Sequence, residues 1–403
     1  MPGTNLRTKK YDAVVFGLFE TGLGVIRSLG QNGLRVIGVD FKSNIGKVSK
    51  YVKSFRCPHP LQKEEKFIEW VRSNFADNHP LPVFITQDDF LAVFSRNRKT
   101  LSEYFVFNMI DHSLLESIAD KYQQSLLAVN AGIESPNTWL VNELSDLQRI
   151  QDDLSFPLII KGRDVNSWRN SIGRGIKVYP ANDKSELKSI LSGILEKGIS
   201  VIVQELICGP ETNHYKYCSY ISEDGKILCE FTLRKIRQNP VRFGVGTVVE
   251  SVYNPEIIAL GRKLFSAIGF IGVGSAEFKQ DQSDGTIKLI EINPRYWQQN
   301  SLATECGINF PYMNYLDLLQ QHQDPVVEFK PGIKWINSIK DFDTFLTYNK
   351  EGRLSYKDWR NTLKGEKIYS DFTWDDPLPR LYQFGFGPNL LKLPRFIIRN
   401  IRK

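Results

Sequence analysis

The amino-terminal stretch of this chain holds the pattern that most constrains its fold. An apolar run at residues 14–16 predicts a buried strand, and a run at 36–40 predicts a second one. Between them, Val25, Ile26 and Leu29 recur at helical spacing. A strand, a helix and a strand in this order form a βαβ unit, whose strands are parallel and joined by a right-handed crossover. The sequence therefore predicts an α/β domain built on a parallel sheet.

The glycines of the first turn do not match a dinucleotide-binding motif. Gly17, Gly22 and Gly24 depart from the GxGxxG spacing, and Leu23 stands where a P-loop needs lysine. An NAD-dependent oxidoreductase therefore has little support. The alternatives are tight packing between strand and helix, or a substrate pocket.

A second polar turn follows an apolar run at residues 82–85. Residues 86–89 are Thr-Gln-Asp-Asp, placed at the carboxyl end of a strand, which is where open α/β sheets bind ligands. The alternative is that Thr86 or Asp88 caps the helix that follows.

From residue 156 the pattern changes to a smaller unit. Lys161 lies inside an otherwise apolar strand, and residues 166–175 form a polar loop that contains glycines. A lysine in such a strand is costly unless its ammonium group meets an anion. That anion is either a phosphate or a carboxylate of the protein.

Residues 274–297 predict two adjacent strands, with Asp284 and Gly285 in the turn. Glu277 lies on the first strand, and Glu291 and Asn293 end the second. Two carboxylates and an amide oxygen suit Mg²⁺, which completes its octahedron with water and substrate phosphate. The alternative is an ordinary hairpin with acids on its solvated face.

Composition bounds the class of protein. The chain has 403 residues, of which 41% are apolar and 12% aromatic, as in a folded soluble protein of about two to four structural units. It contains no apolar run of about 18 residues and no apolar signal core at its amino terminus. The five cysteines are scattered without a CxxC pair, which indicates reduced thiols. We expect a cytoplasmic protein.

The net charge of +7 is concentrated partly at the chain ends, so no nucleic-acid partner is expected. No acid follows Asp376, and residues 389–403 mix cations with large apolar side chains. Such a tail can make weak contact with an anionic membrane surface, which would place the protein peripherally on a membrane. The alternative is a terminal helix docked on the body and interrupted by Pro394.

Several of these residues occur in an order that resembles the ATP-grasp superfamily, most of all its carboxylate-amine ligases, such as D-aspartate ligase, and its carbamoyl-phosphate-synthase-like and biotin-carboxylase-like proteins. The resemblance covers roughly residues 10 to 320 and rests on Lys121, Lys161, the loop 166–175, the run 204–207, Glu277, Glu291 and Asn293. It implies an α/β and α+β architecture, in which a Rossmann-like domain precedes a two-subdomain ATP-grasp fold. The corresponding boundaries are 1–110 for the first domain, 111–155 for linker helices, 156–208 for the small subdomain, 209–325 for the large subdomain with the metal site, and 326–403 for a carboxyl-terminal segment of unknown fold.

The resemblance also implies roles for individual residues. ATP phosphates would be contacted by Lys121 and Lys161 and covered by a flap that includes Ser167, Ser171, Gly173 and Gly175. The adenine and ribose would lie near Gln204, Glu205, Leu206, Ile207, Glu211 and Asn213. Glu277, Glu291 and Asn293 would hold Mg²⁺, and Arg295 would meet the transferring phosphoryl group or the substrate carboxylate.

The implied reaction joins a small-molecule carboxylate to an amine through an acyl phosphate, with release of ADP and phosphate, in peptide, cell-wall or surface-polysaccharide metabolism. The basic strand residues Arg234, Lys235 and Arg237 are candidates for an acceptor-side anion site, or else for a solvated strand face. An ATP-binding sensor or membrane scaffold without turnover remains the alternative. Relatives of this family are often homodimers.

Overall fold

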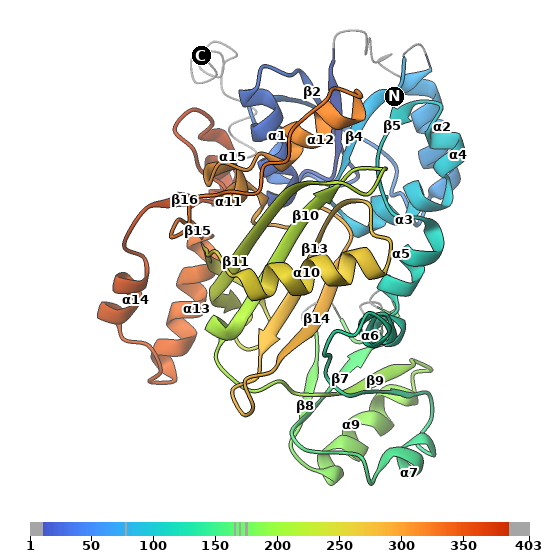
Figure 1. Cartoon of the computed structure of the whole chain (residues 1–403), viewed down its shortest axis with the longest axis vertical. Coiled ribbons are helices and arrows are strands. Elements are labelled where there is room, and N and C mark those ends of the chain that lie inside the picture. Colours follow the sequence, from blue (N-terminus) through green and yellow to red (C-terminus); the bar gives the residue numbers. More distant parts are fainter. Residues whose placement is uncertain (1–10, 77–78, 165–166, 169–170, 174–175, 387–403) are drawn as a thin grey trace.

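The computed structural model describes residues 11–76, 79–164, 167–168, 171–173 and 176–386, which form three sheets (Figure 1). The tail at 389–403 and Gly175 lie outside the described residues. The expected fold class, a parallel α/β domain followed by α+β units, is confirmed.

The first sheet is parallel, with the strand order β3-β2-β1-β4-β5. Its strands are β1 (Ala13–Phe16), β2 (Val36–Asp40), β3 (Val52–Arg56), β4 (Leu81–Ile85) and β5 (Phe105–Val106). Every residue of β1, β2 and β4 is buried, as expected for a parallel sheet covered on both faces. The chain leaves β1 toward β2 and later returns to its other side with β4. The carboxyl ends of β1 and β4 therefore form the switch point where such sheets bind ligands.

The helices of this domain and of the connection that follows are α1 (Glu20–Gln31), η2 (Ile45–Val48), α2 (Glu64–Phe75), α3 (Asp88–Arg96), α4 (Arg98–Leu101), α5 (His112–Ala119) and α6 (Lys121–Asn130). Asp111 caps α5 and Asp120 caps α6 with their side chains. The predicted end of a helix near Gly132 is confirmed, since this glycine has a φ of +64° two residues beyond α6.

The second sheet is small and antiparallel, with the order β6-β9-β7-β8. Its elements are β6 (Thr138–Val141), α7 (Asp146–Ile150), β7 (Leu158–Gly162), β8 (Tyr179–Ala181), α9 (Lys184–Leu195) and β9 (Val201–Glu205). The stretch 111–155, expected to hold linker helices, contains α5, α6 and α7 and also contributes the strand β6. β6 pairs with β9 and forms one edge of the small sheet.

The third sheet has the order β14-β13-β10-β11-β12-β15-β16. Its main elements are η3 (Glu211–Asn213), β10 (His214–Ile221), β11 (Ile227–Asn239), β12 (Val245–Ser251), α10 (Pro255–Ala267), β13 (Gly272–Gln280) and β14 (Ile287–Asn293). The predicted hairpin of β13 and β14 is confirmed. α10 packs on one face, where the rings of Tyr217 and Phe265 lie 5.6 Å apart. We call the opposite face, which carries Glu277, the inner face.

The carboxyl-terminal segment, for which the sequence indicated no fold, extends this sheet and then returns to the first domain. Its elements, after α11 (Asn300–Glu305) and α12 (Phe310–Leu318), are β15 (Lys334–Ile336), α13 (Ser338–Lys350), α14 (Tyr356–Thr362), β16 (Lys367–Tyr369), α15 (Leu378–Leu381) and η4 (Tyr382–Phe386). Buried Asp376 accepts hydrogen bonds from Arg27 Nε at 3.0 Å and Ser49 Oγ at 2.7 Å. This contact fastens the segment to α1 and the turn before β3.

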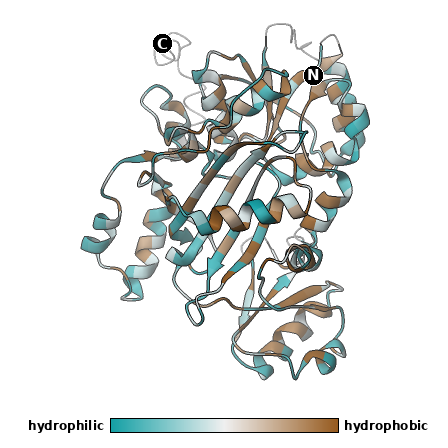
Figure 2. Cartoon of the chain, in the orientation of Figure 1, coloured by the Kyte–Doolittle hydropathy of each residue, from teal (hydrophilic) through white to brown (hydrophobic). Residues whose placement is uncertain are grey.

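Apolar residues run along the strands, whereas hydrophilic residues are frequent on the peripheral helices (Figure 2). The first domain and the large sheet share two buried clusters, and the small sheet has its own core against α9. Within the described part of the chain, no helix is long and apolar enough to cross a membrane.

Candidate active site between the two antiparallel sheets

The predicted metal ligands lie on the inner face of the large sheet. Glu277 on β13 is directly opposite Glu291 on β14, and Ser275 is opposite Asn293. Since side chains two residues apart on a strand point to the same side, Glu277, Glu291 and Asn293 share one face. Lys216 on β10 continues the same row beside Glu277.

One histidine and two lysines lie close to the carboxylate of Glu277. Glu277 lies 2.8 Å from His214 Nε2, 3.0 Å from Lys216 Nζ and 3.3 Å from Lys235 Nζ. Burial alone would raise the pKa of Glu277, but Lys216 and Lys235 hold this pKa well below its ordinary value. Burial, with repulsion from Lys235, lowers the pKa of His214 to about 4, so the imidazole is neutral at pH 7.

Glu291 has a separate partner from the start of α6. Lys121 Nζ lies 2.5 Å from Glu291 Oε1. Burial alone would raise the pKa of Glu291, but the Lys121 ammonium lowers it to about 2. Lys121 is held in place because its N–H donates to Arg163 O at 3.0 Å, and Arg163 Nε donates to Asp120 at 2.6 Å. The beginning of α6 thereby joins the end of β7 to the large sheet.

The small sheet supplies the other wall of a cleft. Lys161 on β7 donates to Gln204 Oε1 on β9 at 2.8 Å, and Gln204 Nε2 donates to Thr138 Oγ1 at 2.8 Å. Burial, with repulsion from Lys121, lowers the pKa of Lys161 to about 8. The cleft is open to solvent, and it is lined by Lys121, Gln124, Ser125, Ala128, Ser135, Pro136, Lys161, Ile202, Gln204, Leu289 and Ile290.

The charges of this region favour a polyanionic ligand. Lys121, Lys161, Lys216 and Lys235 supply four ammonium groups around the carboxylates of Glu277 and Glu291. Among the described residues, no carboxylate lies within ion-pair distance of Lys161, and its ammonium bonds an amide oxygen instead. Of the two anions that the sequence left open for Lys161, a phosphate therefore fits better than a carboxylate of the protein.

The carboxylates suit Mg²⁺ by their chemistry. They are hard oxygen ligands on neighbouring strands, with the amide of Asn293 on the same face. The part of the chain that the structure describes contains no group of three or more His, Cys, Asp or Glu side chains placed to hold a metal. An ion here would therefore need water and ligand oxygens to complete its coordination, as Mg²⁺ sites usually do.

The connection from the small to the large sheet carries the residues expected near adenine and ribose. Glu205 Oε1 lies 2.6 Å from Lys288 Nζ, and Ile207 O accepts from Lys279 Nζ at 2.8 Å. Leu206 N donates to Pro157 O at 3.3 Å. Asn213 Nδ2 donates to Gln280 O at 3.2 Å. These bonds fix the connection, and the expected nucleotide contacts stay predictions.

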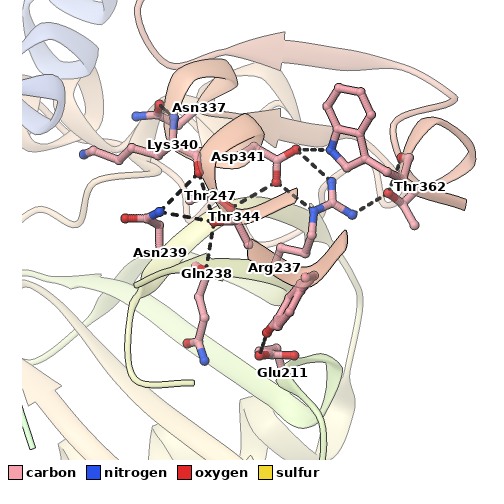
Figure 3. A network of polar contacts seen from close by, with 12 residues as sticks. Glu211, Arg237, Gln238, Asn239, Thr247, Asn337, Lys340, Asp341, Thr344 and Thr362 are labelled. Atoms are coloured by element: carbon pink, nitrogen blue, oxygen red, sulfur yellow. Dashed lines mark hydrogen bonds and ion pairs between the residues drawn. The ribbon is translucent and has the colours of Figure 1, made fainter. Parts of the chain in front are cut away.

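Glu211, at the end of this connection, has a partner that the sequence did not indicate. It accepts a hydrogen bond from Tyr348 OH of α13 (Figure 3). The carboxyl-terminal segment therefore contacts a residue that is expected near the ribose.

The flap is described only in part. Ser167 N donates to Asp164 Oδ1 at 2.7 Å, and Trp168 is buried with its Nε1 donating to Ile176 O at 2.7 Å. Gly173 has a φ of +114°, a conformation that favours glycine. The roles of Ser167, Ser171, Gly173 and Gly175 over the phosphates stay predictions.

Arg295 connects the metal-bearing strand to the switch point of the first sheet. Its Nη2 lies 3.2 Å from Asp88 Oδ2, and Nη1 donates to Tyr296 O at 3.2 Å. Burial would lower the pKa of Arg295, but Asp88 raises it. Thr86 or Asp88 was the alternative expectation for the cap of α3, but the N-cap residue is Gln87. Thr86 Oγ1 instead lies 3.0 Å from Phe16 O and 2.9 Å from Gly17 O.

The prediction that Arg234, Lys235 and Arg237 form one anion site is wrong. Lys235 points to the inner face, whereas the pairing of Arg234 with Glu250 at 3.0 Å lies on the opposite face. An irregularity between residues 235 and 237 then turns buried Arg237 toward Asp341, 2.7 Å away (Figure 3). The bulge changes which side chains share a face.

Sequence reasoning missed His214 and Lys216, although their alternation along β10 was a usable signal.

It also missed the buried Glu20 at the start of α1. This carboxylate accepts from Asn337 Nδ2 at 2.7 Å and lies 3.3 Å from Lys340 Nζ. Burial raises the pKa of Glu20. No local pattern relates these residues, since they are more than 300 positions apart.

Comparisons with known proteins agree with this architecture. A family model described as a RimK-like ATP-grasp domain matches residues 118–218, and one described as ATP-grasp in the biosynthetic pathway with Ter operon matches residues 232–340. A D-aspartate ligase of Enterococcus faecium (strain Aus0004) is 26% identical over 230 residues. The match covers 55% of this chain and 55% of that ligase, so the chain spans about half the length of this curated relative.

Solved structures show the same fold. N5-carboxyaminoimidazole synthetase from Staphylococcus aureus, complexed with ADP, has a TM-score of 0.63 at 16% identity, with 80% of each chain covered. L-amino acid ligase from Bacillus licheniformis has a TM-score of 0.58 at 18% identity, covering 80% of this chain and 77% of that one. The chain therefore has the ATP-grasp fold, and ATP-grasp family models match it over residues 118–218 and 232–340.

Proposed function

We propose that the protein is an ATP- and Mg²⁺-dependent ligase that joins a carboxylate to an amine and releases ADP and phosphate. The observation that carries this proposal is a cleft lined by Lys161 and Lys121, where Lys121 forms an ion pair with Glu291 and Glu291 lies opposite Glu277 on the large sheet. Its surplus of ammonium groups suits a triphosphate, and its carboxylates suit the metal that accompanies one. The relatives named above include a D-aspartate ligase and an L-amino acid ligase.

Glu277, Glu291 and Asn293 would hold Mg²⁺, which when bound neutralises charge on the phosphate oxygens. For this to happen, Lys121 must leave Glu291, and Lys216 or Lys235 must leave Glu277. The carboxylates of Glu277 and Glu291 would then bind the metal ion, and the displaced lysines would bind the phosphate chain. The exchange therefore keeps every buried charge compensated, as a low-dielectric site requires.

Lys121 and Lys161 would bind phosphate oxygens from opposite walls of the cleft. Phosphoryl transfer needs little covalent participation by the protein, so catalysis would consist mainly of positioning and charge stabilisation. Arg295, two residues beyond Asn293, would orient the reacting carboxylate or the transferred phosphoryl group. The connection 204–207 would bind adenine, and Glu211 or Asn213 would bind the ribose.

The first substrates to test are amino acids, with aspartate among them, because of the relatives' names. The product would be an amide formed through an acyl phosphate, in peptide, cell-wall or surface-polysaccharide metabolism. A cytoplasmic location and a homodimer stay predictions.

The test is ADP release by the purified protein with pools of carboxylates and amines, in the presence and absence of Mg²⁺. Glu291→Ala should abolish release, whereas the exposed Glu65→Ala on α2 should leave it unchanged. Release that needs both a carboxylate and an amine would support the ligase. Tight ATP binding without release under any pool would favour the sensor alternative.

A further inference from the structure

Helix α13 of the carboxyl-terminal segment reaches the connection between the two antiparallel sheets. Its buried residues recur at helical spacing and are Asp341, Thr344, Phe345 and Tyr348. Asp341 pairs with Arg237 of β11 at 2.7 Å, and Thr344 Oγ1 lies 3.2 Å from Gln238 O on the same strand. These contacts anchor the helix on the large sheet. Tyr348 ends the buried stripe, and its hydroxyl group donates to the carboxylate of Glu211 in η3 (Figure 3).

The surroundings of Tyr348 fix its ring and keep its hydroxyl group a donor. The residue is 5% exposed, and the guanidinium carbon of Arg353 lies 4.7 Å from the centre of its ring. Burial and the hydrogen bond to Glu211 raise the pKa of Tyr348, so the hydroxyl group stays protonated at neutral pH. A donor that is locked by packing orients the group that accepts from it.

The carboxylate of Glu211 keeps acceptor capacity for a ligand. Among the described residues, no other side chain donates a hydrogen bond to it, and no cation lies within ion-pair distance of it. A carboxylate has about four lone-pair sites, and Tyr348 uses one of them. Glu211 is partly exposed, so the remaining sites can accept hydrogen bonds from hydroxyl groups of a bound molecule.

Glu211 also lies close to the connection at 204–207, where adenine is expected. Burial lowers the pKa of Lys279, and the nearby Glu211 carboxylate opposes this shift. Lys279 Nζ in turn donates to Ile207 O at 2.8 Å. The other candidate for the ribose, Asn213, already donates its amide nitrogen to Gln280 O at 3.2 Å. The two ribose hydroxyl groups are donors, and a charged carboxylate accepts from them more strongly than an amide does.

We propose that Tyr348 is a positioning residue, which orients the carboxylate of Glu211 toward the ribose hydroxyl groups and so makes the site selective for a ribonucleotide. The inference rests on the proposed function, because it requires a nucleotide in the cleft with its ribose at Glu211. It gives the carboxyl-terminal segment, for which the sequence indicated no fold, a part in recognising the nucleotide.

The test compares the dissociation constants of ATP and of dideoxy-ATP, which lacks both ribose hydroxyl groups. They are measured by titration calorimetry with Mg²⁺ and without carboxylate or amine substrates, so that the readout does not depend on turnover. The wild-type protein should bind ATP roughly ten-fold more tightly than dideoxy-ATP, which is the effect of one hydrogen bond to a charged group.

Tyr348→Phe keeps the ring and removes only the hydroxyl group. This change should raise the Kd of ATP roughly five-fold, because Glu211 loses its fixed orientation, and leave the Kd of dideoxy-ATP unchanged. Glu211→Ala should make the two dissociation constants nearly equal. The matched control is Tyr356→Phe on α14, a tyrosine of the same segment that is 56% exposed, and it should change neither constant.

Equal weakening of ATP and dideoxy-ATP binding in Tyr348→Phe would overturn the proposal, because a purely structural role would not distinguish the two nucleotides. Tighter ATP binding in this variant would overturn it as well, since the hydrogen bond would then withhold Glu211 from the ligand. Equal dissociation constants in the wild type, or no effect of Glu211→Ala, would refute the inference and leave the proposed ligase standing. Failure of the wild type to bind either nucleotide would overturn the proposed function and this inference with it.

Discussion

The buried pair of Arg237 and Asp341 allows a quantitative prediction about the carboxyl-terminal segment. The exposed fractions of these residues are 3% and 1%, and the guanidinium donates to both carboxylate oxygens, at 2.7 and 2.9 Å. Asp341 also accepts from Trp359 Nε1 at 2.8 Å and from Thr247 Oγ1 at 3.2 Å (Figure 3). The pair therefore joins β11 and β12 to α13 and α14. We consider the change Arg237→Met.

Removing one partner of a buried ion pair typically costs about 3–5 kcal/mol, because the other charge is left uncompensated. Trp359 and Thr247 would still donate to Asp341, so we expect the lower end, about 3 kcal/mol. The loss should appear as local opening of α13 and α14, where amide hydrogen exchange would accelerate by about 100-fold.

The assay is hydrogen exchange followed by mass spectrometry, with peptides from 338–362 compared with peptides from β1 to β5. The matched control is Arg234→Met on the same strand, whose ion pair with Glu250 is also about 3.0 Å long but partly exposed. Such pairs contribute at most about 1 kcal/mol, so exchange should accelerate less than about five-fold. Arg237→Met combined with Asp341→Leu should recover much of the protection, because no unpaired charge remains.

An effect of Arg237→Met on substrate binding would instead support the earlier assignment of Arg237 to a substrate site. If Arg237→Met raised the KM for an acceptor substrate and left exchange in 338–362 unchanged, the structural assignment would be refuted. Equal effects of Arg237→Met and Arg234→Met would also contradict the argument, since it rests on the difference in burial.

Three further predictions concern the cleft and the segment that returns to the first domain. The affinity for ATP should fall as pH rises through about 8, because Lys161, whose pKa is lowered to about 8, then loses its proton. Lys161→Met should remove this pH dependence in calorimetric titrations. The same pH dependence in the variant as in the wild type would contradict the assignment to Lys161. Chelation of Mg²⁺ should stop ADP release without lowering the melting temperature, since the lysines already compensate Glu277 and Glu291. Asp376→Asn should reduce the free energy of unfolding by about 3 kcal/mol, because buried Arg27 loses its counterion, and a loss below about 1 kcal/mol would argue against that contact.

Part of the site follows from strand periodicity. Glu291 and Asn293 share a face because they lie two residues apart on β14. Glu277 faces Glu291, however, only because the register of the hairpin shifts between Glu277 and Phe278. Lys161 was notable because it interrupts an apolar strand, and the structure places it at the cleft. His214 and Lys216 obey the same alternation but were overlooked.

The failures have physical causes of a different kind. A bulge between residues 235 and 237 changes the faces of β11, and no local pattern in the sequence marks its position. β6 was missed because a short edge strand between helices carries little apolar periodicity, with three of its four residues only partly buried.

The sequence by itself determined the local elements: the βαβ opening, the hairpin that carries Glu277, Glu291 and Asn293, and the composition of the basic tail. These depend on apolar periodicity and turn residues within a few positions, so a single strand or helix reveals them. Only the tertiary structure decided which charges meet. Lys121 and Glu291 are 170 positions apart, Arg237 and Asp341 are 104 apart, and Arg27 and Asp376 are 349 apart. Such pairs form because packing excludes water around both groups at once, and that condition belongs to the folded chain as a whole.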